Sequence, residues 1–269
     1  MKSVAQIYDE NATGEWRRLE SAPYKSIEFL VTMDRILKYL PRTGKVLDAG
    51  GGPGRYAIEL CRRGYHVVLL DLSEECLNLA KKKILGEPKG VQERLMDLVA
   101  GDIRNLSGFV DNSFEAVMCL DPLSYLCEVE ERRKAASELV RVTKPGGVVC
   151  IAVRGYLAVL RHLLTRFPQE LLDASFGDLV RTGDTLVQGV PVHFFRAQEV
   201  CRLTESVGLV TLEMCGCEGL STGLEEATDA LAEDTARWEC WMDLVLKTAS
   251  EPAVVDMAPH MLYIGRKPD

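Results

Sequence analysis

Short apolar runs alternate with helix-spaced apolar positions through the first 153 of the 269 residues. The runs predict buried strands at 45–48, 65–71, 114–120 and 148–153, and another strand that ends at Ala100. Helical spacing predicts helices at 25–40, 54–63 and 128–142, and one more that Ser73 caps at its N-terminus. Because strands and helices alternate through short connections, we expect a parallel sheet with helices on both faces.

The pattern changes after Arg154. Helical patches, a turn-rich stretch at 177–192 and the aromatic run 193–195 indicate an insertion, and regular structure then resumes. We expect a helix at 197–207, a strand at 209–214, helices across 222–249 and a last strand at 260–265. The whole chain, 1–269, is predicted to be one domain, which divides into an N-terminal helical cap (1–40), a core (45–153), an inserted lid (154–196) and a C-terminal part with an antiparallel strand pair (197–269).

The charge balance argues against two classes of partner. Lys and Arg total 32 and Asp and Glu total 40, whereas tight general binding to nucleic acid or anionic membranes depends on clustered positive charge. Nine cysteines without a CxxC pair and four scattered histidines favour a reducing compartment and no metal. The N-terminus lacks the apolar core of a signal peptide, and the longest apolar run, 148–153, is too short to span a membrane. We expect a cytoplasmic protein without nucleic-acid or membrane partners, and the oligomeric state stays open.

A glycine-rich turn carries the candidate chemistry. The segment from Asp48 to Gly54 reads DAGGGPG, follows a buried strand and opens a helix. Glycine permits positive φ and close approach of the backbone to a ligand, and the first amides of a helix are free to bind it. Asp71, at the tip of the next strand, can accept the hydroxyl groups of a ribose. The pattern indicates a nucleoside-containing cofactor.

The charge of Asp48 distinguishes between two nucleoside-containing cofactors, NAD and S-adenosylmethionine. Residues 52–57 also satisfy the GxGxxA pattern of dinucleotide-binding proteins. A carboxylate beside the site repels a pyrophosphate, but it attracts the ammonium group of S-adenosylmethionine, which has no phosphate. Electrostatics therefore favour S-adenosylmethionine over NAD.

The segment VLDAGGGPG, at 46–54, resembles the DxGxGxG signature of class I S-adenosylmethionine-dependent methyltransferases. Three later segments resemble the same family in the same order: 101–103, 114–120 and the KPGG at 144–147. The start of the chain, around Tyr8 to Leu19, looks like the cap of type 11 small-molecule methyltransferases. The resemblance implies an α/β, Rossmann-like, seven-stranded sheet whose last strand is antiparallel.

The resemblance also implies a cofactor, S-adenosyl-L-methionine, with S-adenosyl-L-homocysteine as its product. Asp48 would contact the amine, Asp71 the ribose and Asp102 the adenine, while Tyr8, Arg18 and the further candidate Arg55 would reach the carboxylate. The full predicted binding set is Tyr8, Arg18, Asp48, Gly50, Gly52, Gly54, Asp71, Leu72, Asp102, Ile103 and Leu120.

The acceptor side is less defined. The segment after the fourth strand, 120–126, lacks the Asn/Asp-Pro-Pro-aromatic motif of enzymes that methylate base or amide nitrogens, so a small-molecule acceptor is expected. An activated methyl donor needs mainly orientation and desolvation, and a hydroxyl acceptor also needs a base. The candidates are Tyr125 and His193 as pocket residues, with Asp121 as a third possible base.

Two alternatives remain at this stage. An NAD(P)-dependent oxidoreductase would need a hydride-site pair, and the chain has no convincing YxxxK. A non-catalytic module that binds S-adenosylmethionine would keep the glycine turn but would not turn over any acceptor.

Overall fold

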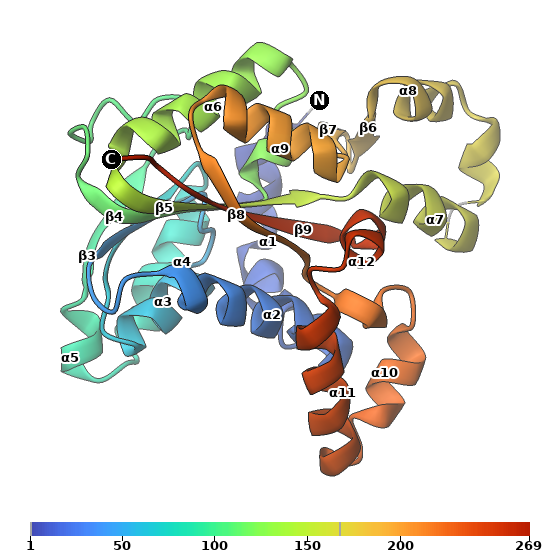
Figure 1. Cartoon of the computed structure of the whole chain (residues 1–269), viewed down its shortest axis with the longest axis horizontal. Coiled ribbons are helices and arrows are strands. Elements are labelled where there is room, and N and C mark those ends of the chain that lie inside the picture. Colours follow the sequence, from blue (N-terminus) through green and yellow to red (C-terminus); the bar gives the residue numbers. More distant parts are fainter. Residues whose placement is uncertain (1, 167) are drawn as a thin grey trace.

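A mixed seven-stranded sheet runs through the middle of the computed structural model, which describes residues 2–166 and 168–269 (Figure 1). Its strand order is β3-β2-β1-β4-β5-β9-β8. The bounds are β1 (Lys45–Ala49), β2 (His66–Asp71), β3 (Leu95–Ala100), β4 (Phe114–Leu120), β5 (Thr143–Arg154), β8 (Val210–Gly216) and β9 (His260–Arg266). The first five strands pair in parallel, and β9 is antiparallel to both β5 and β8. The predicted fold class, with its antiparallel last strand, is confirmed.

Helices cover both faces of this sheet, and each face has its own apolar core (Figure 1). One face carries α2 (Pro23–Tyr39), α3 (Arg55–Arg62), α4 (Glu74–Ile84) and α11 (Thr235–Thr248). The other carries α6 (Val129–Val142), α9 (Ala197–Ser206) and α12 (Pro252–Met257). Successive strand residues alternate between the two cores, as in Val46 and Leu47, because side chains of a strand point to opposite faces.

The N-terminal helix α1 (Val4–Arg18) is tied to the ends of two parallel strands. The Ser73 hydroxyl, just after β2, donates to Asp9 at 2.6 Å, and the Tyr8 and Tyr125 hydroxyls lie 2.9 Å apart. Tyr125 belongs to the short 3-10 helix η1 (Pro122–Tyr125) that follows β4. The helix therefore lies over the edge of the sheet at which the parallel strands end.

The insertion differs from its sequence interpretation. The stretch predicted as turn-rich, 177–192, contains the end of α8 (Ala174–Thr182) and a hairpin of β6 (Asp184–Val187) with β7 (Val190–His193). Gln188 and Gly189 have φ of +53° and +83°, so they form the tight two-residue turn that joins antiparallel strands. The sequence analysis recognised the turn residues but not the two four-residue strands that flank them.

Other elements complete the chain. They are α5 (Lys89–Gln92), α7 (Tyr156–Arg166), η2 (Pro168–Leu172), η3 (Gly219–Ser221) and α10 (Glu225–Leu231). The KPGG segment, predicted as a turn before the fifth strand, lies inside β5, and α5 and α12 were not predicted because each is only one or two turns long. Within the described residues, every helix is too short or too polar to cross a bilayer.

Gly155 fixes the junction between β5 and β9, and its substitution tests that packing. Its amide donates to the Pro259 carbonyl at 2.8 Å, and a Cβ would lie 2.0 Å from the Ala258 carbonyl oxygen. We predict that Gly155→Ala lowers the free energy of unfolding by about 1–3 kcal/mol, measured by urea denaturation, because the backbone must shift. Gly90→Ala is the control, since no described atom lies within 4 Å of its Cβ. Equal stability of the two variants would contradict this packing.

Candidate functional site

A cavity of about 410 Å³ lies under α1 where the parallel strands end. Most residues predicted to bind the cofactor line it, namely Tyr8, Arg18, Asp48, Gly50, Gly52, Asp71, Leu72, Asp102, Ile103 and Leu120. The further candidates Arg55, Asp121 and Tyr125 also line it. Gly54 does not: it caps α3 with φ of +82° and packs near Ala80 and Leu69.

The Asp48 carboxylate lies buried in the wall of this cavity and has no hydrogen-bond partner among the described residues. Its side chain has no solvent exposure, and no described residue hydrogen-bonds to either carboxylate oxygen. Burial, and secondly the neighbouring carboxylate of Asp71, raise the pKa of Asp48 to about 7, although the backbone amide of Ala57 opposes the shift. A buried carboxylate that lacks a donor is costly, so this position is suited to a cationic ligand group that supplies one.

The glycine turn beside Asp48 leaves room for such a ligand. Gly52 has φ of +55°, and a Cβ there would meet no described atom within 4 Å. Its amide donates to Asp71 Oδ2 at 2.7 Å, while the Ser73 amide donates to Asp71 Oδ1 at 2.8 Å. Each carboxylate oxygen has a second lone pair, so Asp71 can hold the turn and still accept ligand hydroxyls. Burial raises the pKa of Asp71, although these amide bonds oppose the shift.

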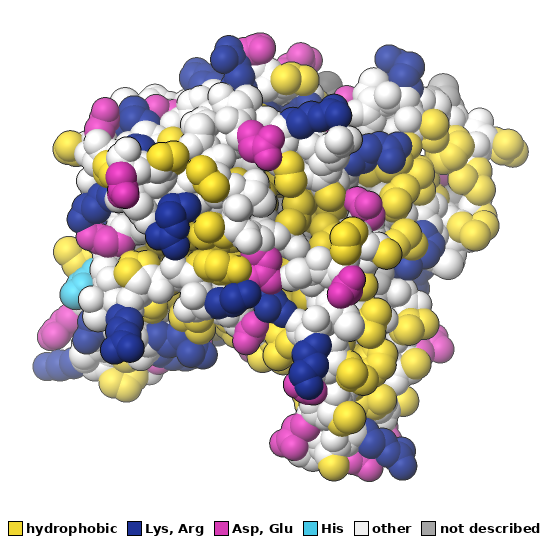
Figure 2. Space-filling model, in the orientation of Figure 1, with side chains coloured by type: hydrophobic (Ala, Val, Ile, Leu, Met, Phe, Trp, Pro, Cys, Tyr) yellow, Lys and Arg dark blue, Asp and Glu magenta, His cyan; other side chains and the backbone are white. Residues whose placement is uncertain are grey.

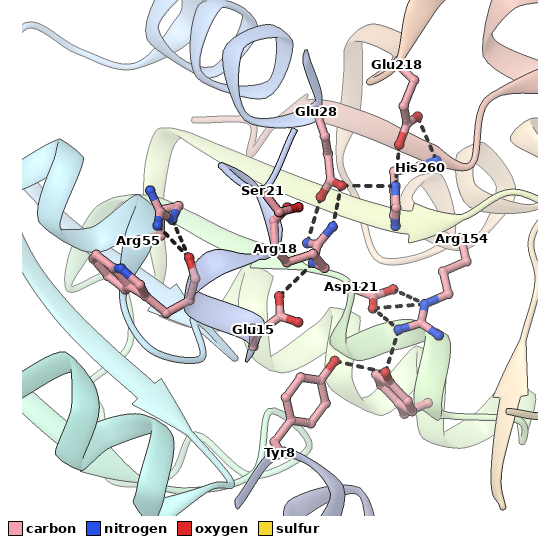
Figure 3. Close-up of polar contacts among 12 residues, drawn as sticks. Tyr8, Glu15, Arg18, Ser21, Glu28, Arg55, Asp121, Arg154, Glu218 and His260 are labelled. Atoms are coloured by element: carbon pink, nitrogen blue, oxygen red, sulfur yellow. Dashed lines mark hydrogen bonds and ion pairs between the residues drawn. The ribbon is translucent and has the colours of Figure 1, made fainter. Parts of the chain in front are cut away.

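The other predicted cofactor contacts already have protein partners. Arg18 makes two hydrogen bonds to Glu28, at 2.5 and 2.9 Å, and a third to Glu15 at 2.9 Å (Figure 3). Arg55 donates to the Trp16 carbonyl and pairs with Glu20. Asp102 accepts from Arg104, and although burial alone would raise its pKa, these bonds lower it. Arg18, Arg55 and Asp102 are thus each paired with charged groups of the protein.

The exit of β4 carries a charged pair with the predicted pocket tyrosine. Asp121, at a left-handed φ of +86°, accepts from Arg154 at 2.6–3.1 Å, and Arg154 also donates to the Tyr125 hydroxyl at 2.5 Å. Burial would raise the pKa of Asp121, but Arg154 holds it below its usual value. Burial raises the pKa values of both Tyr8 and Tyr125, so these hydroxyls stay protonated.

A histidine that sequence reasoning missed completes the floor of the cavity. His260, the first residue of β9, lies beside Glu28 and in front of Glu218 (Figure 3). Its Nδ1 is 2.5 Å from Glu218 Oε1 and 3.4 Å from Glu28 Oε2. Burial would lower the pKa of His260, but the carboxylates of Glu28 and Glu218 raise it to about 9. A signal existed in the sequence: Glu28 is a charged residue on the apolar face of the predicted helix 25–40.

His193 is not brought to this cavity. It is buried in the insertion, with Nδ1 at 2.7 Å from Asp184 and Nε2 at 2.8 Å from Glu199. Its ring packs edge-on against Phe195, with centroids 4.5 Å apart. The chosen histidine therefore joins the hairpin β6–β7 to α9, and we do not carry it further as a pocket residue.

One group in the described residues has spacing that a metal ion could use. Single ligand atoms of Glu28, Glu218 and His260 lie within 4.8 Å of one another. Both oxygens of Glu28 already accept from Arg18, whose positive charge would repel a cation. The cluster is better explained as a hydrogen-bonded ion-pair network.

Comparisons with known proteins agree with this geometry. Residues 47–151 match the family model described as "Methyltransferase domain". The putative methyltransferase YqeM of Bacillus subtilis (strain 168) is 30% identical over 178 residues, or 66% of this chain and 61% of that protein. The tRNA 5-carboxymethoxyuridine methyltransferase of Escherichia coli (strain K12) is 30% identical over 131 residues, or 48% of each. The chain thus spans 61% and 48% of the lengths of these two curated relatives.

A solved structure supports the same assignment of the fold. A SAM-dependent methyltransferase from Methanosarcina mazei has a TM-score of 0.62 and 20% identity, covering 87% of this chain and 97% of that one. Neither the family match nor this fold favours the oxidoreductase alternative. The matched segment contains Asp48, the glycine turn and Asp71, which line the cavity. Residues 47–151 thus match the methyltransferase-domain family, the whole chain has the fold of S-adenosylmethionine-dependent methyltransferases, and S-adenosylmethionine is the cofactor that this family implies.

Proposed function

We propose that this protein transfers a methyl group from S-adenosylmethionine to a small-molecule acceptor. The observation that carries the proposal is the buried Asp48 carboxylate, which has no partner among the described residues and faces the cavity. An ammonium group supplies the missing donor, and the open side of Gly52 accommodates the ligand beside it. S-adenosylmethionine supplies an electrophilic methyl carbon when it is bound.

The protein's own contribution is binding, orientation and exclusion of water. Asp48 holds the amine, Asp71 the ribose hydroxyls and Asp102 the adenine side, while α1 covers the cavity from above. Two of these residues, Asp48 and Asp71, are buried, so their interactions with a ligand are weakly screened. Holding the two reactants in line lowers the activation free energy by roughly 7–11 kcal/mol.

A second cavity supports an acceptor of limited size. It measures about 800 Å³, is lined mostly by residues of 154–194 and shares Arg154 and His260 with the first cavity. Part of its wall is apolar, formed by Ala158, Val159, Leu163, Phe176, Leu179 and Phe194. Glu225, Glu226, Arg161 and Arg166 bring charges of both signs to its lining. This lining suits a molecule with an apolar body and polar substituents.

Charge argues against a nucleic-acid acceptor, although one relative is a tRNA methyltransferase. The net charge is −8, and on the face in Figure 2 the Lys and Arg side chains are interspersed with Asp and Glu. Phosphate backbones are bound through clustered positive charge, which this face does not offer. The proposed acceptor is therefore a free small molecule.

Label transfer tests this function directly. The protein is incubated with S-adenosylmethionine labelled in its methyl group. A cell extract supplies the acceptors, either as its metabolite fraction below 3 kDa or as its purified RNA. We predict label in the small-molecule fraction alone. Label in RNA would contradict the acceptor class, and no label in any fraction would favour the non-catalytic module.

Asp48→Asn should stabilise the ligand-free protein. The pKa of this carboxyl is 3.8 in the unfolded chain and about 7 in the folded one, so stability falls as pH rises between these values and stays low above 7. The neutral amide of Asn avoids this loss of stability. We predict that Asp48→Asn raises the free energy of unfolding by up to about 4 kcal/mol at pH 8 and by less at pH 5. Denaturant titration at both pH values measures the gain.

The same substitution should weaken binding of S-adenosylmethionine about 100-fold or more in calorimetry, because the amide no longer pairs with the ammonium. Asp97→Asn, on the exposed side of β3, is the control and should bind normally. An Asp48→Asn protein that loses stability, or that binds as tightly as the native protein, would refute the assignment.

Tyr125→Phe should lower kcat/KM for the acceptor and leave the affinity for the methyl donor nearly unchanged. The hydroxyl links Arg154 to Tyr8 at the junction of the cavities, so its loss removes orientation on the acceptor side. We predict donor affinity within about twofold of native and a fall in kcat/KM for the acceptor of about tenfold. Tyr156→Phe lies outside both cavities and serves as the matched control. A loss of donor affinity in Tyr125→Phe would place this residue on the cofactor side.

A further inference from the structure

His260 stands where the two cavities meet. It lines both of them, and the antiparallel register of β5 and β9 places it opposite Arg154, the other residue that lines both. Glu218, behind it, is almost fully buried and lines neither cavity. The imidazole is therefore the part of this cluster that a bound acceptor can reach.

Glu218 fixes the orientation of the ring. Its Oε1 lies 2.5 Å from Nδ1 of His260, and its Oε2 accepts from the His260 backbone amide at 3.2 Å. A carboxylate at this distance keeps a proton on Nδ1, so any proton exchange takes place at Nε2. Nε2 points away from Glu218, and no group in 2–166 or 168–269 hydrogen-bonds to it (Figure 3). A carboxylate that orients an imidazole whose other nitrogen is free is the arrangement of a general base.

The other polar side chains of this wall are poor bases. The Tyr8 and Tyr125 hydroxyls stay protonated because burial raises their pKa values. Asp121 is paired with Arg154, which lowers its pKa despite burial. Both oxygens of Glu28 accept from Arg18. Among the groups that line both cavities, Arg154 and His260, only His260 has a lone pair that becomes available by loss of one proton.

We propose that His260 is a catalytic residue, and that Glu218 positions it to take a proton at Nε2 from a hydroxyl group of the acceptor. The O–H bond breaks and the proton passes to Nε2, while its electron pair forms the bond from oxygen to the methyl carbon. The C–S bond breaks with its electron pair on sulfur, which turns the sulfonium into a neutral thioether. Thiolates and neutral amines need no such base, so a dyad that removes a proton favours a hydroxyl as the nucleophile. This inference rests on the proposed methyl transfer and names its acceptor atom.

The charged groups around His260 determine when it can act. The carboxylates of Glu28 and Glu218 favour the imidazolium, whereas Arg18 opposes it. Asp121 and Arg154 face the same junction and largely balance each other. In the ligand-free protein the pKa of His260 is about 9, and a cationic donor in the same cavity lowers it by repulsion. Methyl transfer should therefore accelerate with pH until His260 is neutral and then level off.

The first test does not depend on activity. The ¹⁵N resonances of histidine, followed over pH in the ligand-free protein, should show His260 with its proton on Nδ1 when neutral and a pKa of about 9. Glu218→Gln keeps an oxygen as acceptor but removes the charge, and it should lower this pKa by about one unit or more. His66→Asn, on the exposed start of β2, should leave it unchanged. A neutral ring protonated on Nε2 would overturn the proposal.

The second test follows the labelled product from the small-molecule fraction. We predict that its methyl group is on oxygen, and that kcat/KM for the purified acceptor rises tenfold per pH unit up to a break. In Glu218→Gln the break should move down together with the pKa of His260 measured by NMR. In His260→Asn the pH profile should show no such break, and kcat/KM should fall by about 100-fold or more. The affinity of this variant for S-adenosylhomocysteine should equal that of the native protein.

The outcomes separate this inference from the proposed function. Absence of labelled product contradicts both, whereas label on nitrogen or sulfur contradicts the role of His260 alone. A break that stays in place in Glu218→Gln, although the pKa of His260 has moved, would also overturn the inference. If His260→Asn fails to fold, the paired shift in Glu218→Gln still decides the question.

Discussion

A buried carboxylate without a partner is the constraint on which this site depends. The strand β1 carries Asp48 into the protein interior, and the glycine turn after it brings no side chain that could neutralise the charge. This arrangement is unfavourable in the ligand-free protein, and in the proposed function a bound cation offsets its cost. The same charge would repel a pyrophosphate, so in the proposed function one carboxylate at the tip of one strand selects among nucleoside cofactors.

The remaining charges of the cavity are arranged in the opposite way, since nearly all of them are paired. Arg18 is held by Glu15 and Glu28, Arg154 by Asp121, and His260 by Glu218. These pairs join α1, α2, the exit of β4, the end of β5 and the start of β9. One side of the cavity thus has the unpaired carboxylate of Asp48, while the side proposed to face the acceptor is fixed by ion pairs and hydrogen bonds. The division between the two sides of the cavity is electrostatic as well as spatial.

The sequence brought together those lining residues of the cavity that are local in the chain. Asp48, the turn and Asp71 follow buried strands within 25 residues, and the carboxyl ends of parallel strands lie at one edge of a sheet. The acceptor side could not be predicted in this way, because Glu28, Glu218 and His260 come from segments that are far apart. Only the register of β5 with β9 places His260 opposite Arg154. His193 was chosen for its aromatic neighbours, which prove to be packing partners in the insertion. The predicted segments of the domain, 1–40, 45–153, 154–196 and 197–269, stay predictions.

Proton release on ligand binding tests the central claim most directly. Near pH 7 about half of the Asp48 carboxyls carry a proton in the ligand-free protein, because the pKa is about 7. Calorimetry in two buffers of different ionisation enthalpy counts the protons released on binding. The account predicts about half a proton per S-adenosylhomocysteine bound at pH 7, and none when 5′-methylthioadenosine, which lacks the amino-acid end, is bound. Equal proton release by the two ligands, or none by either, would contradict the assignment of Asp48 as the partner of the amine.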